Sequence, residues 1–177
     1  MITFKLTLEY DGTRYSGWQD QKNARTVMGE LRKAAGMVFR GKFEMQGAGR
    51  TDAGVHALGQ VMHLYVEDEV HEKPQELQRK LNEMLPADIV VLEMERARRT
   101  FHARHDAESR VYVYQISRRK QAFIKKHVWW VKELLDVEAM SRCAAMVVGR
   151  HDFVCFHALD AARPHESTVV EIGRAHV

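Results

Sequence analysis

The feature that most constrains the fold is the order in which strand-like and helix-like apolar patterns follow one another. Residues 2–10 alternate apolar and polar side chains, as a strand with one buried face does. Helical spacing begins after Thr26, a suitable N-cap, and again at Pro74, which opens a second helix that Pro86 ends. Further strand-like runs lie at 42–46, 59–66 and 88–96.

The resulting order of strand, helix, strand, strand, helix, strand predicts an α+β fold. It is the ferredoxin-like (βαββαβ) arrangement, an antiparallel sheet with two helices on one face. We expect this N-terminal half over residues 1–104 and a second half of the same kind over residues 105–177. The second half has predicted strands at 108–117, 128–131, 153–156 and 168–172, and a helix capped by Asp136 that runs to Val148. By count it lacks its last helix and strand.

A glycine-rich loop between two predicted strands is the main candidate for chemistry. Residues 47–54 contain three glycines, which allow unusual backbone angles and a close approach of a ligand to the main chain. Arg50 and Asp52 lie in this loop with one residue between them, so a cation and a carboxylate are presented together. On pattern alone a turn-capping role for Asp52 is favoured, because Asp and Gly are common turn residues.

The same loop belongs to a series of motifs that resemble one family. GAGRTDAGVHALGQV (47–61) is similar to the signature of the tRNA pseudouridine synthase A family, and LEYDGTRYSGWQDQ (8–21) resembles the opening motif of that family. Three more stretches match in the same order, RKLNEMLPADIVV (79–91), FHARHDAESRVYVYQI (101–116) and LLDVEAMSRCAAMVVGRHDFVCFHA (134–158). The resemblance covers the chain to about residue 172.

This resemblance implies a pseudouridine synthase fold and an isomerase that converts uridine to pseudouridine in the anticodon stem-loop of tRNA, without a cofactor. Asp52 is then the catalytic carboxylate, attacking the substrate or handling protons. Arg50 fills the space vacated by the extruded base, and Tyr112 stacks on the target uracil. Without the resemblance, Tyr112 is expected in a strand core. A homodimer that holds tRNA across both subunits is implied in the same way.

Charge is distributed unevenly along the chain. Residues 67–95 contain nine acids and three bases, whereas residues 96–126 contain ten bases and two acids. A basic block suits phosphate, although two ordinary solvated faces explain it equally. Arg104 and Arg110 are expected to bind the RNA backbone, with ion pairs to Asp106 or Glu108 as the competing interpretation.

The loop at residues 13–24 combines Arg14 with Tyr15 and Trp18. Exposed cations and aromatic rings suit phosphate contact and base stacking. Burial of the two rings, which would pin the loop to the fold, is an equally good interpretation.

Several classes of protein are disfavoured by composition. The histidines show no metal-ligand spacing and there is no Cys-x-x-Cys, so no metal is expected. Cys143 and Cys155 are expected to be buried free thiols, which suits a reducing cytoplasm, and the methionines are expected in the core. No apolar run is long enough for a bilayer, so no membrane association is expected.

One departure from the family pattern leaves a second function open. Members of the family continue into a further strand and a helix bearing an arginine that pairs with the catalytic aspartate. Nothing after Ile172 in this sequence matches that segment. The alternative is therefore a non-catalytic RNA-binding fragment of the same fold.

Overall fold

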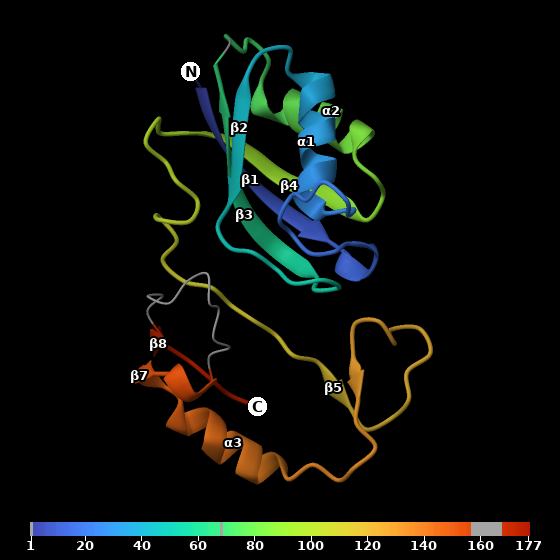
Figure 1. The fold of residues 1–177 in the computed structure, drawn as a ribbon, viewed down its shortest axis with the longest axis vertical. Helices are drawn as coiled ribbons and strands as arrows, with labels where there is room; N and C mark the ends of the chain where they lie inside the picture. The colour runs from blue at the N-terminus through green and yellow to red at the C-terminus, as the bar shows by residue number, and fades with distance from the viewer. Residues whose placement is uncertain (1, 68, 157–167) are drawn as a thin grey trace. The chain divides into compact units, whose positions relative to one another are not determined.

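Strand β1 (Ile2–Tyr10) lies inside a four-stranded antiparallel sheet, in the order β2-β3-β1-β4 (Figure 1). It pairs with β3 (Ala57–Val66) on one side and β4 (Ile89–Ala97) on the other, and β2 (Phe43–Gly47) extends the sheet beyond β3. The structure is a computed structural model that describes residues 2–67, 69–156 and 168–177. The alternation along β1 buries every second side chain on one face of the sheet, as the pattern predicted.

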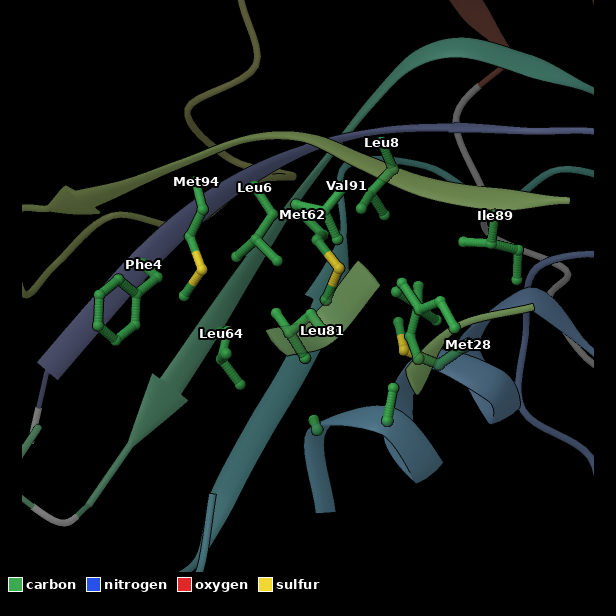
Figure 2. Close-up of a cluster of buried hydrophobic side chains, with 14 of the residues drawn as sticks. Phe4, Leu6, Leu8, Met28, Met62, Leu64, Leu81, Ile89, Val91 and Met94 are labelled. Atoms are coloured by element: carbon green, nitrogen blue, oxygen red, sulfur yellow. The ribbon is translucent and has the colours of Figure 1, made fainter. Parts of the chain in front are cut away.

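Helices α1 (Val27–Val38) and α2 (Pro74–Met84) cover that face of the sheet (Figure 1). Thr26 caps α1, because its Oγ1 accepts a hydrogen bond from the backbone N–H of Gly29 at 3.2 Å. Figure 2 shows the core that results, with Met28 and Leu81 lying among side chains from β1, β3 and β4. The core side chains of the three strands shown there are Phe4, Leu6, Leu8, Met62, Leu64, Ile89, Val91 and Met94.

The mixed helix and antiparallel sheet architecture is confirmed, and the six elements predicted before residue 98 are all present. Met37 and Met84 were predicted to face the core, and that prediction was wrong, since their side chains are 62% and 44% exposed. Both lie in the last turn of their helices, where they line an open hollow of about 530 Å³. No candidate site residue lines that hollow.

The chain divides into two compact units, Met1–Gln115 and Ile116–Val177. In the second unit, β5 (Ile116–Ser117) pairs in parallel with β6 (Trp129–Trp130), and β7 (Gly149–Asp152) pairs in antiparallel with β8 (Val169–Ile172). Helix α3 (Val137–Met146) is capped by Asp136, whose Oδ1 accepts from the N–H of Ala139 at 2.8 Å. Residues 105–115 belong to the first unit rather than to the second.

Two strand predictions for the part of the chain after residue 104 were wrong. Residues 108–115 are not strand, because only Ile116 and Ser117 find a ladder partner within the described part of the chain, and an extended segment becomes a strand only through pairing. Residues 154–156 form a 3₁₀ turn, η2 (Val154–Phe156), and the strand lies earlier, at β7. Gly149, with φ of 105°, turns the chain from α3 directly into β7.

Burial in the second unit also differs from the prediction. Cys143 and Cys155 are free, as expected, but both are exposed. Met146 is 75% exposed, since α3 has no buried residue. The apolar side chains that α3 carries at helical spacing are therefore not buried in a core within the described part of the chain.

Candidate functional site

Backbone hydrogen bonds from the loop after β1 hold the Asp52 loop in place. The N–H of Trp18 donates to the carbonyl oxygen of Thr51 at 2.9 Å, and the N–H of Gly54 donates to the carbonyl oxygen of Tyr15 at 3.2 Å. These two bonds lie on either side of Asp52, whose side chain is exposed. Two motifs that are far apart in sequence therefore form one structure, with the carboxylate presented between its anchor points.

The close approach of these two loops requires glycine at two positions. A Cβ on Gly12 would lie 1.9 Å from the carbonyl oxygen of Val55, and one on Gly17 would lie 2.7 Å from that of Thr51. Gly17 also has φ of 89°, a conformation that favours glycine. The sequence stretch that resembles the family's opening motif thus serves to receive the Asp52 loop.

Side chains add further support to the loop. The hydroxyl groups of Tyr10 and Thr51 are hydrogen-bonded at 2.8 Å, and Nε2 of Gln60 donates to the carbonyl oxygen of Gly49 at 2.8 Å. Burial raises the pKa of Tyr10, the hydrogen bond to Thr51 opposing it, so its hydroxyl stays protonated at neutral pH. Sequence reasoning did not identify Tyr10 and Gln60 as supporting residues. Both lie in the matched motifs, but their pairing with the loop cannot be read from sequence.

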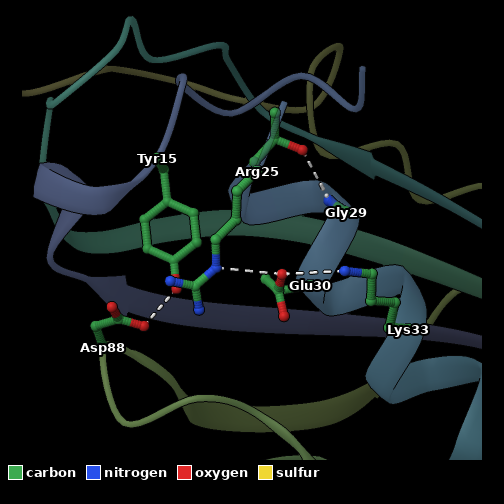
Figure 3. A network of polar contacts seen from close by, with 7 residues as sticks. Tyr15, Arg25, Gly29, Glu30, Lys33 and Asp88 are labelled. Carbon is green, nitrogen blue, oxygen red and sulfur yellow. Dashed lines mark hydrogen bonds and ion pairs between the residues drawn. The ribbon is translucent and has the colours of Figure 1, made fainter. Parts of the chain in front are cut away.

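The aromatic rings of the loop after β1 are buried, at 3% exposure for Tyr15 and 2% for Trp18. Of the two interpretations left open for this loop, burial is therefore the observed one. The Tyr15 hydroxyl donates to the Asp88 carboxylate, and the guanidinium of Arg25 lies over its ring at 4.7 Å (Figure 3). Arg25 is held in turn by Glu30, with 3.3 Å between Nε and Oε1. Burial, followed by the contact with Asp88, raises the pKa of Tyr15.

Residues 101–106 pack on the sheet face opposite the helices, over β3. His63, which points to that face because its neighbours Met62 and Leu64 are in the core, accepts a hydrogen bond at Nδ1 from the N–H of Ala103 at 3.0 Å. Tyr65, also on that face, donates from its hydroxyl to the carbonyl oxygen of Phe101 at 2.6 Å. Together these bonds fix the backbone on either side of His102.

The pKa of the buried His63 is lower than that of an ordinary histidine. Burial, and to a lesser degree the charge of His102, lowers the pKa of His63 to about 4. Asp106 closes the same segment, accepting from the N–H of His102 at 3.0 Å and pairing with Arg98 at 2.9 Å. The ion pair that was considered for Arg104 or Arg110 is thus made by Arg98.

The cationic candidates occupy different environments. Arg14 is exposed at the end of the 3₁₀ turn η1 (Gly12–Arg14), beside the Asp52 loop, and Arg50 is exposed within that loop. Arg104 is exposed directly after the buried Ala103. Arg110 donates from Nη2 to the carbonyl oxygen of Ala48 at 3.0 Å, so the structure brings it against the start of the Asp52 loop.

Tyr112 follows two residues after Arg110. Its side chain is 75% exposed, which contradicts the expectation of a strand core. The exposed ring is compatible with stacking on a base.

These features define an α+β protein that presents an exposed carboxylate from an anchored glycine-rich loop. Residues 7–106 match the family described as tRNA pseudouridine synthase. The tRNA pseudouridine synthase A of Dictyoglomus thermophilum is 37% identical over 174 residues, which are 97% of this chain and 70% of that protein. The chain belongs to the tRNA pseudouridine synthase family.

Two further relatives, also named tRNA pseudouridine synthase A, match this chain at a similar level of identity. The protein of Agrobacterium fabrum is 40% identical over 164 residues, covering 90% of this chain and 61% of its own length. The protein of Thermodesulfovibrio yellowstonii is 35% identical over 158 residues, which are 88% of this chain and 61% of that protein. The chain thus spans about 61% to 70% of the length of these curated relatives. Among the described residues, none of the helices combines the length and apolar character needed to cross a bilayer.

The low pKa of His63 predicts a pH dependence of stability. The unfolded chain takes up a proton on His63 near pH 6.5, whereas the folded chain does so only near pH 4. The contribution of His63 to the free energy of unfolding is therefore highest above pH 6.5. It decreases as pH falls from 6.5 to 4, by about 3 kcal/mol at most. Urea unfolding at intervals across this range measures the loss.

A pair of substitutions tests whether His63 causes this slope of the unfolding free energy against pH. His63→Asn keeps an acceptor for the N–H of Ala103 but removes the titration, so the slope between pH 4 and 6.5 is expected to become shallower. His71→Asn, at a histidine whose side chain is 88% exposed, is expected to leave the slope unchanged. Identical slopes in both variants would show that His63 is not responsible.

Proposed function

We propose that this chain isomerises uridine to pseudouridine in the anticodon stem-loop of tRNA, with Asp52 as the catalytic carboxylate. The observation that carries the proposal is the exposed Asp52 on a loop anchored on both sides by backbone hydrogen bonds. This loop lies within the region that matches the family. A loop whose backbone is anchored presents its carboxylate with little reorganisation when a substrate arrives, which favours reaction with a positioned nucleotide.

The reaction requires three events at one nucleotide. The bond between N1 of uracil and C1′ of ribose breaks, the freed uracil turns, and C5 bonds to C1′ while C5 loses its proton and N1 gains one. Asp52 either attacks the nucleotide to form a covalent intermediate or accepts and returns protons, and both roles require the ionised form. The isomerisation has no net redox change, so the proposal includes no cofactor.

Other candidate residues act on the nucleotide and the RNA backbone. Arg50, two residues before Asp52 and exposed, takes the place of the extruded base. Arg14 and Arg104 contact phosphates, since both are exposed and neither lies in the core. Binding that depends on phosphates predicts an affinity for tRNA that falls as salt is raised.

Tyr112 is proposed to stack on the target uracil. Tyr112→Phe keeps the ring and is expected to retain activity, whereas Tyr112→Ala is expected to lose about 10-fold to 100-fold in kcat/KM, since base stacking contributes about 1–3 kcal/mol. Tyr114→Ala, at a ring that is 89% exposed, is the matched control and should behave like the unsubstituted chain. A fully active Tyr112→Ala variant would remove this role.

The proposal extends to the remaining fold and assembly. Residues 105–177 belong to a second ferredoxin-like half, and the protein acts on tRNA in the cytoplasm as a homodimer. Support for these points comes from the sequence motifs shared with the family. Sedimentation of the chain at several concentrations tests the dimer, and a mass that stays at one subunit would contradict it.

The direct test of the function is release of tritium from tRNA labelled at C5 of uridine. Release by this 177-residue chain is expected, because the C5 hydrogen is lost in the reaction. The second candidate is a non-catalytic RNA-binding fragment of the same fold, which would bind tRNA through the same exposed arginines. Bound tRNA without release would support that second function.

A further inference from the structure

Arg110 contacts the backbone where β2 leads into the Asp52 loop. Its Nη2 donates to the carbonyl oxygen of Ala48 at 3.0 Å and more weakly to that of Arg104 at 3.5 Å. Its Nε would lie 3.6 Å from a Cβ built on Gly49, so the side chain crosses directly over this glycine. Arg110 is an exposed residue, but its guanidinium lies against this main chain.

The contact with Ala48 completes the hydrogen bonding of a buried peptide group. Ala48 is only 8% exposed, and its N–H donates to the carbonyl oxygen of Val61 on β3 at 2.8 Å. Its own carbonyl oxygen receives the bond from Arg110. A charged donor strengthens such a bond, and a buried carbonyl left without its partner is costly. Ala48 is therefore held both by the sheet and by Arg110, four residues before Asp52.

The position of Arg110 in the chain gives this contact a second consequence. Tyr112, the proposed stacking residue, follows two residues later in a segment without regular secondary structure. We propose that Arg110 is a positioning residue that fixes the start of the Asp52 loop and ties the Tyr112 segment to it, instead of serving mainly as a phosphate contact. This inference rests on the proposed function for its catalytic consequence, but the structural part does not.

Arg104 provides a matched comparison within the same basic segment. It is an exposed arginine whose backbone carbonyl, rather than its guanidinium, meets Arg110. Arg104→Gln and Arg110→Gln remove the same charge from neighbouring positions. If both residues only attract phosphate, the two variants should weaken tRNA binding to a similar degree and leave the loop unchanged.

Hydrogen exchange on the free chain tests the structural part. In Arg110→Gln the amides of residues 47–56 are expected to exchange at least about 10-fold faster, because a bond to a charged group contributes roughly 1.5–3 kcal/mol. In Arg104→Gln they are expected to exchange at the original rate. Equal exchange in the two variants would overturn the inference, and this readout needs no tRNA and no activity. If Arg110→Gln does not fold, Arg110→Lys is compared instead.

Kinetics with tRNA test the catalytic part. Arg110→Gln is expected to lower kcat about 10-fold or more while its KM stays close to that of the unsubstituted chain, whereas Arg104→Gln is expected to raise KM. Reduced affinity with unchanged kcat would mean that Arg110 acts as a phosphate contact, which overturns the proposal. Absence of tritium release by the unsubstituted chain would instead refute the proposed function, and the exchange experiment would still decide the role of Arg110.

Discussion

Replacing Asp52 with alanine is expected to abolish tritium release from C5-labelled tRNA, by at least about 10³-fold, while tRNA binding changes little. Loss of an essential acid or base commonly costs 10²-fold to 10⁴-fold, and loss of a nucleophile costs more. The substitution should not disturb the loop, because its anchor bonds run through the backbone of Thr51 and Gly54. Single-turnover tritium release and a tRNA binding titration on the same preparation measure the two effects separately.

A control carboxylate distinguishes chemistry from charge. Glu83→Ala on α2 also removes one exposed negative charge, but at a side chain that pairs with Arg79. It is expected to keep full activity. If Asp52→Ala lost binding and activity in equal measure, or if it remained active, Asp52 would be a turn residue or an RNA contact rather than the catalytic group.

Replacing Gly12 with alanine is expected to have the second largest effect. The added Cβ would lie 1.9 Å from the carbonyl oxygen of Val55, a backbone atom that can move only with the Asp52 loop. The chain therefore either loses stability, by about 2–4 kcal/mol, or relieves the clash by displacing the loop. Displacement by even about 1 Å would lower kcat by roughly 10²-fold, because the reacting groups are no longer aligned.

Gly36→Ala is the matched control for Gly12→Ala. Gly36 lies inside α1 with no heavy atom within 4 Å of a built Cβ, so alanine should increase stability by roughly 0.5–1 kcal/mol. Urea unfolding and tritium release, measured on both variants, show whether the effect comes from the contact between loops. A Gly12→Ala variant that keeps both stability and activity would contradict the observed packing.

Local patterns predicted residues 2–97 of the first unit well because the strands and helices there bury one face each. Alternation placed β1, and capping and helical spacing placed α1 and α2, within one or two residues of their ends. The same reasoning failed for residues 108–115 and 153–156, which are apolar enough for strands. Whether such a segment becomes a strand depends on a partner elsewhere in the chain, and periodicity contains no information about that partner.

The sequence by itself determined the element order up to residue 97, the family and the glycine-rich loop that presents Asp52. Only the tertiary structure decided how that loop is held, because its anchors come from residues 10–18 and from Arg110, which are distant in sequence. It also decided that Tyr15 and Trp18 are buried whereas Tyr112 is exposed. Burial depends on what packs against a side chain in space, and an aromatic residue type is compatible with either environment.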